Sequence, residues 1–138
     1  MPPPVWSTIY YCKRLLVPVL PCQVGLKGLY LASNEALAAL PEGLCSLAGL
    51  EELNLMQCGL RALPKWCGGL AGLRTLDLWG NTGLGALPDG FVRLRNLEAL
   101  DLDHCPALHT LKQLQEREGL PSLLAHLAAK GELAAGAC

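Results

Sequence analysis

Residues 73–88 read LRTLDLWGNTGLGALP, and this stretch decides the fold. Its first module has the frame L-x-x-L-x-L-x-x-N, formed by Leu73, Leu76, Leu78 and Asn81. In this module leucine alternates with polar residues, which is the period-2 pattern of a strand with one buried face. The second module, L-x-x-L-P, ends at Pro88. Proline suits the first turn of a short helix, because its missing N–H costs no hydrogen bond there.

The same frame occurs four times, at spacings of 24, 23 and 24 residues. The first leucines of the four copies are Leu26, Leu50, Leu73 and Leu97. The L-x-x-L-P module follows in the first three copies, whereas Lys112 replaces the proline in the fourth. One copy cannot bury its leucines alone, but stacked copies share a continuous core. The sequence therefore predicts a repeat solenoid over residues 25–111.

These motifs resemble the leucine-rich repeat family, in the L-x-x-L-P variant of intracellular Ras-group proteins and plant resistance proteins. The resemblance covers residues 26–111, some 60% of the chain. It implies an α/β solenoid, a right-handed coil with short parallel strands on the concave side, short helices or turns on the convex side, and a C-terminal helical cap. All matching positions are structural, so the resemblance is specific for fold and not for function.

Composition agrees with a single folded domain. The chain has 138 residues, of which 51% are hydrophobic and 17% charged, and this argues against disorder. There are 33 leucines but only five valines, which is unusual for an ordinary sheet protein. The formal net charge is −1 and the basic residues do not cluster, so we expect no nucleic-acid partner. No apolar run reaches ~18 residues, so we expect no membrane span.

The seven cysteines include no C-x-x-C pair, and their number is odd. This pattern predicts neither a zinc site nor a disulfide framework, and it favours reduced, buried thiols in a cytoplasmic protein. The polar run from Asp103 to Cys105, with His109, is the densest candidate for chemistry. In the repeat frame Cys105 points inward while Asp103 and His104 point outward, so we expect no metal site and no catalytic pair. No G-x-G-x-x-G or P-loop motif is present, and no cofactor is expected.

One polar position recurs at the end of each frame. It is occupied by Asn34, Cys58, Asn81 and Cys105. A buried amide is costly unless it is hydrogen-bonded. We therefore expect these side chains to bond backbone groups of neighbouring turns and to form a structural ladder.

The x positions of the frame point away from the core and form the expected binding face. They carry two cations and six anions, a charge of −4 on one side of a chain whose total is −1. The candidate partner-binding residues are Tyr30, Asn54, Met56, Asp77, Trp79, Asp101 and Asp103. Acidic groups beside an exposed Trp suggest a site for a basic segment of another protein. The alternative, that these are merely solvated strand positions, stays open.

Both ends of the array need separate treatment. Residues 1–24 are a cap, a degenerate repeat or a disordered tail, and the sequence does not decide between them. Residues 112–138 are expected to form a helical cap with a frayed tail over Gly136–Cys138. Its two helices are predicted at Thr110–Glu118 and Pro121–Lys130, and Gly131 suits the position just beyond the second helix.

The sequence favours a non-catalytic module for binding another protein, with no nucleic acid, membrane or cofactor as partner. The resemblance implies a scaffold or adaptor role in signalling. Two alternatives remain. The chain is a fragment of an immune-type receptor, or it is the substrate-presenting repeat domain of a larger enzyme such as a kinase or ubiquitin ligase.

Overall fold

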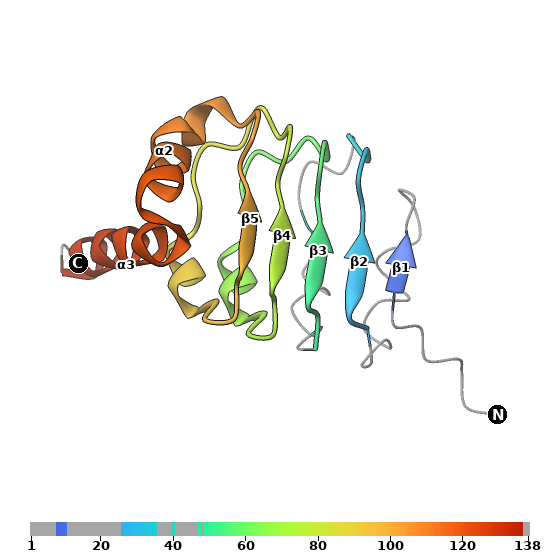
Figure 1. The fold of residues 1–138 in the computed structure, drawn as a ribbon, viewed down its shortest axis with the longest axis horizontal. Coiled ribbons are helices and arrows are strands. Elements are labelled where there is room, and N and C mark those ends of the chain that lie inside the picture. Colours follow the sequence, from blue (N-terminus) through green and yellow to red (C-terminus); the bar gives the residue numbers. More distant parts are fainter. Residues whose placement is uncertain (1–7, 11–25, 36–39, 41–46, 48, 137–138) are drawn as a thin grey trace.

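Figure 1 shows a computed structural model of the chain, a row of parallel strands with helices at its C-terminal end. The structure describes residues 8–10, 26–35, 40, 47 and 49–136. The strands are β1 (Thr8–Tyr10), β2 (Gly28–Tyr30), β3 (Glu52–Asn54), β4 (Thr75–Asp77) and β5 (Ala99–Asp101). They form one sheet in chain order, and each pairs in parallel with the next. In such an order, each connection brings the chain from the carboxyl end of one strand to the amino end of the next, as in a solenoid.

The central residues of the strands pair in register. They are Ile9, Leu29, Leu53, Leu76 and Leu100. The pairing continues past the strands, since Leu55 N–H donates to Asp77 O at 2.8 Å and Leu78 N–H donates to Asp101 O at 3.0 Å. The repeat frame thus fixes both the hydrogen-bond register and the direction of the leucine side chains.

The leucines of successive repeats form one apolar interior. Its fully buried members include Leu26, Leu29, Leu31, Leu50, Leu55, Leu60, Leu70, Leu73, Leu78, Leu84 and Phe91. These residues belong to a single hydrophobic cluster that runs from the repeat of β2 to helix α3 (Leu120–Gly136). The core is therefore shared between repeats rather than divided among them.

A left-handed residue follows each strand of the four described frames. The positions are Ser33 (φ 63°), Gln57 (φ 51°), Gly80 (φ 74°) and His104 (φ 57°). A positive φ costs a non-glycine residue about 1 kcal/mol. The conformation recurs because it turns the chain so that the next residue, the ladder residue, points into the core.

Asn81 shows what the ladder position does. Its Nδ2 donates to Leu55 O at 2.9 Å and to Leu78 O at 2.8 Å. Its Oδ1 accepts N–H groups from Cys58 at 3.1 Å and from Leu60 at 3.2 Å. The buried amide thus joins two repeats through four backbone groups, and its own polar atoms are all used.

The thiols at the same position make fewer bonds. Cys58 Sγ donates to Leu31 O at 3.0 Å, and Cys105 Sγ donates to Leu78 O at 3.1 Å. Asn34 Nδ2 donates to Leu31 O at 2.6 Å. Burial raises the pKa of both thiols, which keeps them neutral and able to donate.

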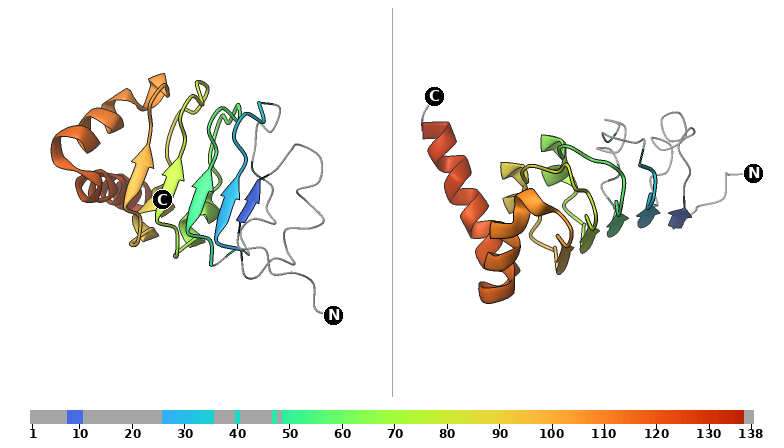
Figure 2. Two further views of the ribbon diagram at one scale, coloured as in Figure 1. Left: turned by 45° about the vertical axis from the view of Figure 1, so that its right-hand side comes forward. Right: turned by 90° about the horizontal axis from the view of Figure 1, so that it is seen from above.

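The L-x-x-L-P modules that end at Pro64 and Pro88 each lead into a short 3-10 helix. These helices are η3 (Lys65–Gly69) and η4 (Asp89–Arg93), and they lie across the stack from the strands (Figure 2). Pro64 and Pro88 take the N-cap position with extended backbone, φ −69° and −68°. The prediction that proline opens the first turn is therefore wrong by one residue, and each proline stands just before its helix.

The two 3-10 helices approach each other closely at glycine. A Cβ atom on Gly68 would lie 2.3 Å from the carbonyl oxygen of Gly90. A Cβ atom on Gly69 would meet nothing within 4 Å. Of these two neighbouring glycines, only Gly68 is therefore required by the packing of η3 on η4.

After β5 the repeat pattern ends and helices follow. They are η5 (Pro106–Leu108), α2 (His109–Glu118) and α3, and Gly119 (φ 90°) separates the last two. Helix α3 runs through Gly136, so the predicted end at Lys130 with Gly131 beyond it is wrong. A single glycine costs a helix only about 1 kcal/mol, and the alanines and leucine that follow favour continuation. The predicted frayed tail lies partly outside the described residues.

The sheet contains one strand more than the four that the leucine frames predict. The leucine frame does not predict β1, because isoleucine stands at its centre and the frame around it has no leucines. The spacing nevertheless fits, since Leu20-Pro21 follows Ile9 at the distance at which Leu40-Pro41 follows Leu29. Of residues 1–24 the structure describes only this strand, so the choice among a cap, a degenerate repeat and a disordered tail stays a prediction.

We predict that Asn81→Ala destabilises the protein by about 3 kcal/mol or more, because it leaves several buried backbone groups without partners. The matched control is Asn96→Ala, whose exposed amide donates only to Ala71 O at 3.0 Å, and we expect it to cost less than ~1 kcal/mol. Urea unfolding followed by circular dichroism measures both variants. Equal losses in the two variants would show that the ladder position is energetically ordinary.

We predict that Gly68→Ala costs about 2 kcal/mol, because its methyl group would force η3 away from η4. Gly69→Ala, at the next position of the same helix, is expected to change stability by at most ~0.5 kcal/mol. Thermal unfolding of the two variants gives the comparison. An unchanged melting temperature for Gly68→Ala would contradict the close approach.

Candidate functional site

The outward side chains of the strands form one face, which we call the strand face. Its central column consists of residues paired across neighbouring strands. They are Tyr30, Asn54, Asp77 and Asp101, and all four side chains are half-buried. The strand face thus places two carboxylates side by side, one on β4 and one on β5.

These column residues also end their strands. Asp77 Oδ1 accepts the N–H of Trp79 at 2.9 Å, and Asp101 Oδ1 accepts the N–H of Asp103 at 2.9 Å. In the repeat of β3, Asn54 Oδ1 accepts the N–H of Met56 in the same way, at 3.0 Å. Such a bond to the backbone two residues on is typical of Asp and Asn at a turn. It occupies one oxygen of each carboxylate and fixes its orientation.

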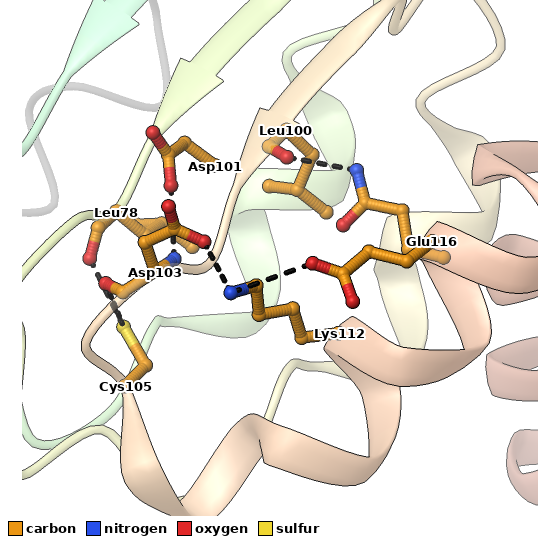
Figure 3. Close-up of polar contacts among 8 residues, drawn as sticks. Leu78, Leu100, Asp101, Asp103, Cys105, Lys112 and Glu116 are labelled. Carbon is orange, nitrogen blue, oxygen red and sulfur yellow. Dashed lines mark hydrogen bonds and ion pairs between the residues drawn. The ribbon is translucent and has the colours of Figure 1, made fainter.

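A pocket of about 520 Å³ lies where β4 and β5 meet helix α2. Its lining residues are Thr75, Leu76, Asp77, Ala99, Leu100, Asp101, Leu102, Asp103, Lys112, Gln115 and Glu116. Figure 3 shows the side chains of Asp101, Asp103, Lys112 and Glu116 gathered in this region. The structure therefore brings together three of the seven predicted binding residues, Asp77, Asp101 and Asp103, and adds residues of α2 that the sequence did not indicate.

Lys112 supplies the positive charge of this pocket. Its Nζ lies 2.7 Å from Asp103 Oδ1 and 3.4 Å from Glu116 Oε1 (Figure 3). The hydrogen bond to Asp103 is the main cause that raises the pKa of Lys112. Lys112 stands where earlier frames have proline, and this departure from the pattern was the one available signal for it.

Gln115 connects α2 to the last strand of the sheet. Its Nε2 donates to Leu100 O at 2.8 Å. A strand at the edge of a sheet carries backbone groups that lack a neighbour, and a side-chain donor can satisfy one of them. Gln115 thus takes the place that a further strand would fill.

Two pairs of opposite charges on the strand face form ion pairs. Lys27 Nζ lies 3.3 Å from Glu51 Oε1, and Arg74 Nη2 lies 2.9 Å from Glu98 Oε1. The contact with Glu98 raises the pKa of Arg74. Within the described part of the chain, Asp77 and Asp101 take part in no ion pair. The negative charge of the strand face that no described cation pairs therefore lies at Asp77, Asp101 and Glu52, and the Glu52 carboxylate accepts the Tyr30 hydroxyl.

Four of the predicted binding residues do not line the pocket: Tyr30, Asn54, Met56 and Trp79. The Tyr30 hydroxyl bonds the Glu52 carboxylate instead. The ring of Trp79 packs edge-on against His104, with centroids 4.8 Å apart and planes at 64°. Trp79 is half-buried, so it is less available than the sequence suggested.

The described residues offer no site for a metal ion, since they contain no group of three or more His, Cys, Asp or Glu side chains suited to one. Cys105 points into the core, His104 packs on Trp79, and His109 contacts Gln113. Burial also raises the pKa of Cys67 to about 12, which makes its thiol a poor nucleophile. In the part of the chain described, no helix has the length and apolar character needed to cross a membrane.

Basic residues gather at one place that the sequence did not reveal. Arg61, Lys65 and Arg93 line a second pocket, of about 680 Å³, beside η3 and η4. Basic residues do not cluster along the sequence, but the expectation that they do not cluster is wrong for the folded chain, where three of them line one pocket. Arg61 and Arg93 lie 32 positions apart in the sequence, and the stacking of repeats brings them to one pocket.

Comparison with solved structures identifies an LRR protein of Leptospira interrogans as similar. The match has 33% sequence identity and a TM-score of 0.59, and it covers 64% of this chain. The chain spans only 22% of the length of that protein. No family model and no curated protein matches the sequence.

We predict that Gln115→Ala destabilises the protein by about 1–2 kcal/mol, because it leaves the Leu100 carbonyl at the edge of the sheet without its donor. Gln113→Ala is the control, since Gln113 is exposed on the same helix and bonds only His109. Urea unfolding of both variants tests the difference. A control that loses as much stability would assign the effect to the helix and not to the edge contact.

Proposed function

We propose that this chain, whose repeats are similar to those of the LRR protein of Leptospira interrogans, is a non-catalytic protein–protein interaction module whose strand face binds a basic segment of a partner. The observation that carries this proposal is the position of Asp77 and Asp101. Their carboxylates lie on adjacent strands, line one pocket and are held by backbone bonds. A fixed pair of anions beside a hollow favours a lysine or arginine side chain as ligand.

The contacts of Lys112 support this choice of ligand. Its ammonium group already lies between Asp103 and Glu116, so the pocket accommodates one cation of this kind. A partner's cation would bind toward Asp77 and Asp101, on the strand side of the pocket. An ion pair near a protein surface has a Coulomb energy of about 1–4 kcal/mol at 4 Å, and salt weakens it.

The size of the strand face fits a contribution to a larger interface. Five strands at about 4.8 Å spacing span roughly 19 Å. We propose that Tyr30, Asn54, Met56 and Trp79 extend the contact along the columns away from the acidic pocket. The half-buried aromatic ring of Trp79 would contact an apolar side chain of the partner.

We also propose that residues 25–111 are the repeat domain, coiled in a right-handed sense, and that residues 112–138 cap it. Three contacts support the cap. Leu123 and Leu127 are buried in the common core, and Gln115 bonds the edge strand. Exposed repeat ends tend to aggregate, so a cap keeps the module soluble.

A reducing compartment suits the described cysteines. Cys58, Cys67 and Cys105 are buried free thiols, which is usual in the cytoplasm. We therefore propose a cytoplasmic location. A scaffold or adaptor role in signalling rests on the resemblance of the L-x-x-L-P motifs alone.

The repeat of β3 shows which substitution preserves the turn. Asn54 makes the same backbone bond as Asp77 and Asp101, so Asp→Asn removes a charge and keeps the turn. The probe is a fluorescently labelled peptide that contains several lysines, and anisotropy measures its affinity. We predict that Asp77→Asn combined with Asp101→Asn weakens binding at least tenfold, about 1.4 kcal/mol, at low salt.

The control combines Glu118→Gln with Glu35→Gln. Both side chains are exposed and lie outside the pocket, and the two substitutions remove the same total charge as the two Asp→Asn substitutions. We expect the control to retain the affinity of the unchanged protein within about twofold. A peptide that binds equally well to the Asp→Asn variant, or loses as much affinity in the control, would overturn the proposed site. Thermal unfolding of the variants shows that the fold is intact.

A further inference from the structure

The second pocket is lined in part by residues of η3 and η4. These helices lie across the stack from the strands (Figure 2). We propose that the second pocket binds an acidic peptide segment, in which carboxylates flank an apolar side chain. This inference goes beyond the proposed function, because it concerns a different surface and a ligand of opposite charge. Its support comes from charge, from the apolar floor and from the rigidity of the walls.

Three cations surround the pocket. Arg61, Lys65 and Arg93 all line it, and all three are exposed. Among the acidic side chains that the structure describes, which do not include that of Asp89, none forms an ion pair with these three residues. Among the lining residues no acid occurs. A rim lined by three basic residues and no acidic one attracts carboxylates and orients them, since arginine can bind them through two parallel hydrogen bonds.

The floor of the pocket is apolar. It contains Leu63 and Leu87, which are 7% and 5% exposed, together with Ala62 and Ala86. A bare phosphate ion placed on this floor would lose water without gaining hydrogen bonds there. A peptide that sets an apolar side chain on the floor and carboxylates on the rim matches both features, so the acidic peptide is the favoured ligand.

The walls are held in place by contacts between repeats. η3 and η4 meet backbone to backbone at Gly68 and Gly90, and these helices carry Lys65 and Arg93. Gly85 N–H donates to Arg61 O at 3.4 Å and links the two loops that form the other side. A pocket fixed in this way loses little freedom when a ligand binds.

Together, the strand face and the second pocket suit a bridging protein, which binds one partner on each surface. The strand face is acidic and suits a basic partner, whereas the second pocket is basic and suits an acidic one. Opposite charges on the two surfaces discourage either partner from occupying the wrong site. The second pocket does not depend on the first, so the failure of one proposal leaves the other standing.

The experiment measures anisotropy of a labelled peptide that carries glutamates on both sides of one leucine. We expect Arg61→Gln combined with Arg93→Gln to weaken its binding at least tenfold at low salt. The control is Arg95→Gln combined with Arg117→Gln, which removes the same charge at exposed positions outside the pocket. It should weaken binding less than twofold.

Two further comparisons separate the alternatives. Replacing the peptide's leucine with serine should weaken binding several-fold if the apolar floor takes part. A single-stranded DNA oligonucleotide should bind more weakly than the acidic peptide. The proposal is overturned if the control variant loses as much affinity as the arginine variant, or if the oligonucleotide binds more tightly through the same arginines. Thermal unfolding confirms that each variant is folded.

Discussion

Everything in this molecule depends on the stacking of one leucine on the next across neighbouring strands. The strands are only three residues long, and none would be stable alone. Register pairing places Leu29, Leu53, Leu76 and Leu100 in one line, and burial of each leucine contributes about 2 kcal/mol. Asn81 adds a second link, since its amide bonds the backbone of two repeats at once. Stability is thus a property of the stack and not of any single unit.

The same stacking determines where charge gathers. Asp77 and Asp101 are local turn residues, each needed to end its own strand, and the register sets them side by side. Arg61 and Arg93 are unremarkable in the sequence, yet the packing of η3 on η4 brings them to one pocket. A repeat protein can therefore obtain two faces of opposite charge from side chains that serve different purposes within each unit. We regard this as the physical basis of the proposed bridging role.

The sequence predicted the repeats well because leucine periodicity reports directly on burial, and the prediction of a leucine-rich repeat protein is confirmed. The prediction from sequence failed at residues that do not follow the leucine periodicity. The leucine frame does not predict the first strand, because Ile9 occupies the position that pairs with Leu29. Helix α3 passes Gly131 because one glycine is a weak stop signal. The contributions of Lys112 and Gln115 depend on how α2 packs against the sheet, and no local pattern encodes that contact.

Nuclear magnetic resonance tests most directly whether stacking converts the strand-end carboxylates into a receptor for cations. Trp79 and Asp103 each donate a backbone N–H to one of these carboxylates, so their amide signals report on it. Titration with a lysine-containing peptide should shift these two signals together and leave that of Arg61 unchanged. The account is contradicted if both signals stay in place while amides elsewhere shift.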